Sequence, residues 1–301
     1  MKALNKWPLL LVLTLLAAAS PGYGQAKDPA PVYVGAWSVD NEWKYVTPEV
    51  LKEIGTKRIL LGSRSWGLAI SGWVARYIKD LKVVYGKRVE EGKFDAVSPD
   101  AFKDPGIFNF VVDGSSKRLL FFDDFIRKEP WSFGGKIDGA LQTLYYMGDK
   151  QNLDETYFPV LDALAKDFPN IKFAVATHDI NAVGKAASGK DEVEASGWNI
   201  RGGDYSEAVI KHYYGKLPIF DMRDIVSTRP DGTVSSFVHT NGKTYRTMVR
   251  EYCIPNGDLI HANAPEGAQR LGRGFVILLA KMYCPDKFPP NPDAPKPEIL
   301  K

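Results

Sequence analysis

Cysteine, histidine and net charge are all scarce in this 301-residue sequence, which contains two cysteines and four histidines. Lys and Arg number 39 against 36 Asp and Glu, so there is no basic surplus that would attract nucleic acid or an anionic membrane. The few histidines and cysteines nowhere have the spacing of zinc ligands, and we predict neither a metal nor another cofactor. These absences leave a nearly neutral globular protein that works with ordinary side chains.

The longest apolar run lies near the N-terminus and is too short to span a membrane. It covers residues 9–19, two lysines precede it, and small residues follow at Gly22 and Gly24. This is the pattern of a secretory signal peptide, whose apolar core is about half as long as a transmembrane helix. We predict a bacterial signal peptide at residues 1–24, with Ala26 as the alternative cleavage site, and a periplasmic or secreted protein without stable membrane insertion.

Short apolar segments alternate with amphipathic ones along most of the remaining chain. Strands are predicted at residues 57–62, 107–114, 137–149 and 171–179, and helices at 65–81, 117–128, 155–168 and 205–215. This alternation is typical of a parallel sheet with helices on both faces. We therefore predict one α/β domain at residues 25–285, a three-layer α/β/α sandwich with a mostly parallel central sheet, followed by an exposed Pro-rich tail at residues 286–301.

Three segments depart from this alternation. Residues 178–203 are polar and glycine-rich without a clear period, which predicts a lid or a disordered insertion. Residues 217–225 are interpreted as a short strand that turns into a loop. Residues 233–250 form two alternating runs joined by Asn241-Gly242, the strongest short-range signal for a β-hairpin. The hairpin is predicted to be an insertion at the edge of the fold.

The two cysteines flank the last predicted helix, residues 265–283. Cys253 lies upstream of this helix and Cys284 follows its end. The predicted export would place both thiols in a compartment where disulfides persist. We predict a Cys253–Cys284 disulfide, and the alternative is two separate buried thiols.

Two serines lie in the bend GSRSWG, which joins the first predicted strand to its helix. Ligands of open parallel sheets bind at the carboxyl ends of the strands, where Ser63 and Ser65 are expected. A neutral serine becomes a nucleophile only when a base removes its proton. From this bend alone, a helix cap is the better explanation of Ser65.

The histidines supply a candidate base. His261 lies in a loop rich in Gly, Pro and Asn, three residues after Asp258. With this spacing a carboxylate can hold one imidazole nitrogen while the other nitrogen faces a serine. His178 ends a predicted strand and could line the same edge of the sheet. His212, in a helix, and His239, on the hairpin, are expected to be packing or surface residues.

The order of these elements resembles the SGNH (GDSL-type) hydrolase superfamily. A serine follows the first central strand, and Asp-x-x-His precedes the final helix. More narrowly, a branch of exported proteins whose first motif is usually Gly-His-Gln-Ser-Val-Gly is similar to the segments ILLGSRSWGLAISGWV, GKIDGALQTLYYMGD, YYGKLPIFDMRDIVSTRPDG and GDLIHANAPEGAQRLG. The resemblance covers about residues 55–283.

This resemblance implies a catalytic triad and an oxyanion hole. Ser65 would be the nucleophile, His261 its base, and Asp258 the residue that orients the imidazole. The oxyanion hole would combine the backbone N–H of Ser65 with Gly114 and Asn152.

Two positions depart from the family pattern. Gly148 and Asp149 stand where Gly-x-Asn-Asp is expected, so the oxyanion asparagine is displaced by three residues to Asn152. Ser63 replaces the histidine that is usual in the branch. Because loss of one oxyanion donor raises a reaction barrier by roughly 2.7–4 kcal/mol, an inactive member of the family is a live alternative.

The implied activity is serine-dependent hydrolysis of an ester, either a carbohydrate O-acetyl group or another short-chain ester of a small molecule. Two alternatives stay open. A non-catalytic, exported carbohydrate-binding protein on the same fold would not hydrolyse a short nitrophenyl ester. A polysaccharide O-acyltransferase would hydrolyse it slowly, and a sugar acceptor would accelerate the reaction.

Overall fold

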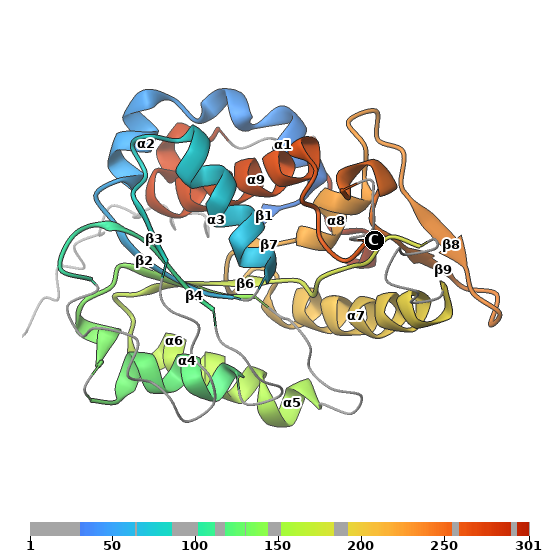
Figure 1. Ribbon diagram of the computed structural model, residues 1–301. Coiled ribbons are helices and arrows are strands. Elements are labelled where there is room, and N and C mark those ends of the chain that lie inside the picture. Colours follow the sequence, from blue (N-terminus) through green and yellow to red (C-terminus); the bar gives the residue numbers. More distant parts are fainter. Residues whose placement is uncertain are drawn as a thin grey trace, which may run out of the picture. The chain divides into compact units, whose positions relative to one another are not determined.

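The central sheet of the computed structural model has seven strands, counted over the residues that the structure describes (Figure 1). These residues are 31–63, 65–85, 102–111, 118–129, 131–143, 152–183, 192–254, 259–289 and 294–300. In sheet order the strands are β1 (Tyr33–Val34), β7 (Ile219–Phe220), β6 (Lys172–Ala176), β5 (Gly139–Gln142), β2 (Arg58–Ser63), β4 (Gly106–Val111) and β3 (Val83–Tyr85). All neighbouring strands are parallel, which confirms the predicted α/β class.

Helices cover both faces of this sheet (Figure 1). One face carries α1 (Ala36–Asn41), α2 (Pro48–Ile54), α3 (Ser65–Tyr77), α8 (Met222–Ser227) and α9 (Pro265–Tyr283). The other carries α4 (Arg118–Arg127), α5 (Leu153–Thr156), α6 (Phe158–Asp167) and α7 (Glu192–Tyr213). Side chains alternate along β2 accordingly, because Ile59 and Leu61 enter the first core and Leu60 enters the second. The three-layer arrangement is therefore the one predicted.

The predicted hairpin forms a small second sheet. β8 (Ser236–Val238) and β9 (Thr244–Arg246) are antiparallel. Gly242 in the connecting turn has a φ of 78°, a left-handed conformation that glycine adopts without steric cost. The Asn241-Gly242 signal is thereby confirmed.

Residues 31–54 are held in place by partners near the other end of the chain. β1 pairs with β7, and Asp40 accepts two hydrogen bonds from the Arg270 guanidinium at 2.6 and 3.0 Å. Glu42 forms a second ion pair with Lys281, at 2.7 Å. The sequence analysis did not predict this segment, because a two-residue strand and a six-residue helix are too short to show a period.

The predicted lid or disordered insertion at residues 178–203 is wrong for its second half, where α7 begins. α7 is 22 residues long and contains three of the glycines that suggested a loop, Gly197, Gly202 and Gly203. A Cβ at Gly202 would lie 2.7 Å from His178 Nδ1 and 2.9 Å from Arg223 Nη1. Gly202 therefore lets the helix approach a buried polar cluster. Residues 184–191 lie outside the described part of the chain.

The segment 217–225 also ends in a helix rather than the predicted loop. β7 is followed at once by α8, whose first turn is capped because the Asp221 carboxylate accepts a hydrogen bond from Asp224 N at 3.0 Å. The strand predicted at 137–149 is β5, which covers only four residues.

The end of the chain packs on the domain, although residues 286–301 were predicted to be an exposed tail. Pro297 is buried, and Glu298 forms an ion pair with Arg246 at 3.0 Å. The two apolar residues that follow pack against the core on the α7 face. These contacts fix a segment whose composition alone suggested an extended, solvated chain.

The predicted disulfide between Cys253 and Cys284 is not formed, and both side chains are buried as separate thiols. Tyr252, beside Cys253, packs against Gly267 in the first turn of α9, whereas Cys284 ends that helix. A 19-residue helix is roughly 28 Å long, and a disulfide requires Cα atoms within about 7 Å. Packing of the loop onto the start of α9 thus keeps the two thiols apart.

The predicted signal peptide at residues 1–24 lies outside the described residues. Within the part of the chain that the structure describes, no helix is both long and apolar enough to cross a membrane. Cleavage and export therefore stay predictions.

Candidate active site

The bend between β2 and α3 separates the two candidate serines. Ser63 is the last residue of β2 and is completely buried, and its Oγ donates a hydrogen bond to Asn109 Oδ1 on β4 at 2.5 Å. Ser65 is the first residue of α3 and is half-buried. Because a buried hydroxyl that bonds an amide does not reach a substrate, Ser65 is the serine of this bend that a ligand can contact.

A chain of buried hydrogen bonds ties the first turn of α3 to β4. Asn109 Nδ2 donates to Ser71 Oγ at 2.8 Å, and Ser71 Oγ donates to the carbonyl of Gly67 at 2.6 Å. Such a network is rigid in a low-dielectric interior, so it fixes the turn that begins with Ser65. The sequence contains a signal for it that the sequence analysis did not use, because Asn109 is a polar residue inside the apolar strand IFNFVV.

Two glycines frame Ser65 because the surrounding elements approach closely. A Cβ at Gly67 would lie 1.8 Å from Ser63 Oγ and 2.2 Å from Ser63 Cβ. A Cβ at Gly62 would lie 2.1 Å from Gln142 Oε1. The Gly-x-x-Ser-x-Gly pattern therefore has a packing reason at both of its glycines.

The loop that carries His261 lies beside the first turn of α3. The centroids of the His261 and Trp66 rings are 6.4 Å apart, with an angle of 45° between the ring planes. Farther along both helices, a Cβ at Gly272 of α9 would lie 2.2 Å from the Trp73 ring of α3. Because the two contacts advance together along the chain, α3 and α9 run side by side in the same direction. Their N-termini lie at the same edge of the sheet.

This arrangement brings a histidine to the helix turn that carries a half-buried serine. The first turn of a helix has four N–H groups without intrahelical partners, and the helix dipole makes it positive. α3 begins at Ser65, and α9 begins four residues after His261. Negative charge that develops on a carbonyl oxygen near Ser65 would be stabilised by these groups.

The other predicted site residues are less well placed by the structure. Asp258 and Gly114 lie outside the described residues. Asn152 is exposed and caps α5, because its Oδ1 accepts a hydrogen bond from Asp154 N at 3.1 Å. The cap uses the side-chain carbonyl oxygen of Asn152 and leaves its two side-chain N–H donors unused by the cap. The roles of these three residues stay predictions.

The remaining histidines are held by structural contacts. His178 follows β6, as predicted, but it is buried, with Nδ1 at 2.6 Å from Asp179 Oδ1. His212 stacks on Phe158 with ring centroids 4.1 Å apart and pairs with a carboxylate of α6 at 3.0 Å. His239 Nδ1 accepts a hydrogen bond from the backbone of the hairpin turn at 3.3 Å. His212 and His239 are thus packing and surface residues, as predicted.

A second group of buried polar residues, which the sequence analysis missed, lies at the carboxyl end of β7. The Asp221 carboxylate accepts hydrogen bonds from Tyr33 Oη at 2.5 Å and Thr177 Oγ1 at 2.9 Å. Asp224 accepts one from the first N–H of α1 at 2.7 Å. Burial, and then the charge of Asp224, raises the pKa of Asp221, whereas burial lowers the pKa of Arg223 to about 10.

This second group stabilises the ends of two helices and also lines a cavity of about 800 Å³. Asp221 caps α8 and Asp224 caps α1, and β7 lies three strands, or about 14 Å, from β2. Over the described ranges, no group of three or more His, Cys, Asp or Glu side chains is arranged to hold a metal ion. The bend at Ser65 combines a half-buried serine with a neighbouring histidine loop, and it is the candidate site for chemistry.

Comparisons with known proteins give a likeness of fold. No family model and no curated protein matches the sequence. The chain is similar to the solved structure of a lipase/acylhydrolase from Enterococcus faecalis, with 13% identity, 75% of this chain and 96% of that chain covered, and a TM-score of 0.39. It is also similar to an acetyl xylan esterase, with 13% identity, 76% and 98% covered, and a TM-score of 0.35. Neither the family nor a residue role is transferred from these structures to this chain.

Proposed function

We propose that this protein is an SGNH-type serine ester hydrolase that acts outside the cytoplasm. In this proposal Ser65 attacks the acyl carbonyl, His261 accepts the serine proton, and Asp258 orients the imidazole. The observation that carries the proposal is the contact between the Trp66 and His261 rings, 6.4 Å apart, because it brings the histidine loop to the turn that begins with Ser65.

The reaction has two stages, acylation of Ser65 and hydrolysis of the acyl-serine. First, a bond forms between Ser65 Oγ and the acyl carbon while His261 takes the proton, and the alcohol then leaves with that proton. Second, water attacks the acyl-serine, His261 takes the proton of the water, and the proton passes to Ser65 as the acid is released. In both stages the first-turn N–H groups of α3 stabilise the oxyanion, and Gly114 and Asn152 act as further donors.

The position of the nucleophile supports this mechanism. Small displacements of a reacting group reduce rates strongly, so a nucleophile needs a rigid support. The hydrogen bonds from Ser63 through Asn109 and Ser71 to the carbonyl of Gly67 provide that support on the sheet side of the turn. Ser63 in this scheme positions α3 and does not react.

The proposed substrate is a short-chain ester, with an O-acetyl group on an exported carbohydrate as the first candidate. The predicted signal peptide and the family resemblance support this choice, as sequence features. Other small-molecule esters are the alternative within the same chemistry.

The test is hydrolysis of 4-nitrophenyl acetate by the purified protein and two serine variants. Ser65→Ala should lower the catalytic rate by several orders of magnitude, as loss of a triad nucleophile does in other enzymes, with little change in stability. Ser63→Ala should lower the rate about tenfold or less, because Ser63 acts through the position of α3. It should instead lower the free energy of unfolding by about 1–3 kcal/mol, since a buried group of Asn109 loses its partner.

The opposite pattern of rates would refute the assignment of the nucleophile. A wild-type protein that is folded but inactive on several short esters would favour the carbohydrate-binding alternative. Slow hydrolysis that a sugar acceptor accelerates would favour an O-acyltransferase.

A further inference from the structure

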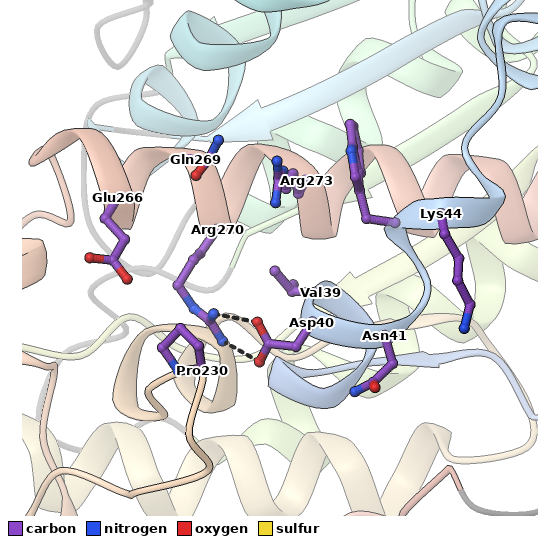
Figure 2. Close-up of a pocket in the computed structure, with 10 residues that line it drawn as sticks. Val39, Asp40, Asn41, Lys44, Pro230, Glu266, Gln269, Arg270 and Arg273 are labelled. Atoms are coloured by element: carbon purple, nitrogen blue, oxygen red, sulfur yellow. Dashed lines mark hydrogen bonds and ion pairs between the residues drawn. The ribbon is translucent and has the colours of Figure 1, made fainter.

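A cavity of about 480 Å³ lies between α9 and residues 39–44 (Figure 2). Its wall consists of one face of α9, the end of α1, the short helix that follows α1, and a turn before β8. The lining residues are Val39, Asp40, Asn41, Trp43, Lys44, Pro230, Glu266, Gln269, Arg270 and Arg273. The volume is within the range of small-molecule sites and is sufficient for a monosaccharide.

One ion pair in the cavity wall is formed by Arg270 and Asp40, whose charged groups bond to each other and to the backbone. Figure 2 shows the Arg270 side chain reaching from α9 to Asp40, where its two terminal nitrogens bond both carboxylate oxygens at 2.6 and 3.0 Å. The third nitrogen, Nε, donates to the carbonyl of Ile225 at 3.2 Å. Arg270 is buried, so this pair forms a fixed, neutral part of the wall.

Arg273, one turn farther along α9, lacks such a partner. Its guanidinium lies 5.1 Å from the centroid of the Trp43 ring, and its Nε is buried without a hydrogen-bond acceptor among the described residues. Burial, and then the charge of Arg270, lowers the pKa of Arg273, and the charge of Asp40 opposes this shift. Because Nε has almost no accessible surface, a ligand in the cavity would contact the guanidinium of Arg273 through its terminal nitrogens.

Lys44 adds a second cation to the same cavity. It is exposed, and in the described part of the chain it forms no ion pair. Glu266 supplies the opposing charge, but it lies two turns of α9 away from Arg273. Once the pair between Arg270 and Asp40 cancels, the cavity retains a net positive charge at the end where Arg273 and Trp43 meet.

We propose that this cavity binds the carboxylate of a small acidic sugar, with Arg273 and Lys44 as the groups that recognise the charge. Arg273 is half-buried and lines the cavity, so the part of its guanidinium that faces the cavity can donate hydrogen bonds to a carboxylate from a planar group, which a lysine cannot provide. The amides of Gln269 and Asn41 line the same cavity and can bond the sugar hydroxyls.

This site is distinct from the bend at Ser65. Arg273 lies eight residues into α9, or about 12 Å from its start, whereas His261 lies in the loop before α9. The binding claim does not depend on the proposed ester hydrolysis, and it is tested by binding alone.

The test is isothermal titration calorimetry of the full-length chain at low ionic strength with sodium D-glucuronate. D-Glucose, which has hydroxyls but no carboxylate, and inorganic phosphate, which has charge but no sugar ring, are the matched ligands. Glucuronate should bind at least tenfold more tightly than either. Because both cations are near the surface, 0.5 M sodium chloride should weaken its binding severalfold.

Variants then locate the bound ligand. Arg273→Met should weaken glucuronate binding about tenfold or more, since hydrogen bonds to a charged group are among the strong ones. Lys44→Met removes an exposed side chain without disturbing the core, and it should weaken binding severalfold. Glu266→Gln should not weaken it. Arg76, an exposed arginine in the last turn of α3, is the control, and Arg76→Met should leave binding unchanged.

Several outcomes would overturn the proposal. They are the absence of glucuronate binding to the wild-type chain, equal affinity for phosphate, or unchanged binding in Lys44→Met and in a folded Arg273→Met. An equal loss in Arg76→Met would show that binding reflects general surface charge and not this cavity.

Discussion

Two glycines of the same helix should respond to alanine with opposite signs. Gly67 and Gly72 both lie in α3, which packs on the sheet beside the candidate nucleophile. A Cβ at Gly67 would lie 2.2 Å from Ser63 Cβ, whereas the nearest atom to a Cβ at Gly72 is Tyr85 Oη, at 3.9 Å. Gly67 is therefore a packing requirement, and Gly72 is only a poor helix former.

The expected magnitudes follow from these distances. Overpacking in a rigid core costs about 1–3 kcal/mol, and alanine regains up to about 1 kcal/mol through its better helix propensity. Gly67→Ala should thus lower the free energy of unfolding by about 1–2 kcal/mol, and Gly72→Ala should raise it by about 0.5–1 kcal/mol. Because Gly67 lies two residues after Ser65, Gly67→Ala should also reduce esterase activity, while Gly72→Ala should not.

Urea unfolding followed by circular dichroism measures both effects, and a double-mutant cycle isolates the contact. Ser63→Gly removes the atoms that a Cβ at Gly67 would meet, although it also removes the bond to Asn109. The double variant should therefore be more stable than the sum of the two single effects by at least about 1 kcal/mol. Additive effects, or a Gly67→Ala protein as stable as Gly72→Ala, would contradict the close approach of α3 to β2.

His178→Ala should lower the free energy of unfolding by about 2–4 kcal/mol, because it removes a buried side chain that contacts Asp179. His261→Ala should stay folded and lose esterase activity. Urea unfolding measures the first effect, and ester hydrolysis measures the second. Asp221 binds its proton more tightly in the folded state, since its pKa is raised, so its contribution to stability is present below the unfolded pKa of about 3.9 and is lost as pH rises toward the folded value. Between pH 4 and 7 the stability of Asp221→Asn should therefore decline less steeply than that of the wild type, and parallel curves would contradict the raised pKa. Finally, both cysteines should react with Ellman's reagent in denaturant without reductant, and only slowly in the folded protein, because burial raises the pKa of Cys284 and Cys253 is also buried. Thiols that react only after reduction, or an intact mass that increases on reduction, would contradict the structure.

The sequence predicted the central elements of the fold because their signals are local. β2, β4 and β6 are apolar runs, and α3 and α9 carry apolar stripes of many turns, so period and length identify them. The bend at Ser65 and the loop at His261 followed from these elements, because the carboxyl ends of parallel strands share one edge of a sheet.

The errors came from residues whose environment is set by distant parts of the chain. Gly202 looked like a loop residue because nothing nearby in sequence shows that His178 and Arg223 crowd that face of α7. Cys253 and Cys284 looked like a pair because both flank α9, but the loop packs against the start of the helix and not its end. Tertiary packing decided each of these cases, and sequence spacing did not contain it.

The anchoring of residues 31–54 has a consequence for how the protein assembles in time. Ala36 and Asp224 are 188 residues apart, and Asp40 and Arg270 are 230 residues apart. Contacts between residues so far apart in the sequence require most of the chain to be in place. They slow folding because long loops must close first. Residues 33–36 therefore find their partners only once β7 and α8 have been synthesised, and Asp40 finds its partner only once α9 has been synthesised. A chain interrupted before α9 would leave Asp40 and Glu42 without their partners Arg270 and Lys281.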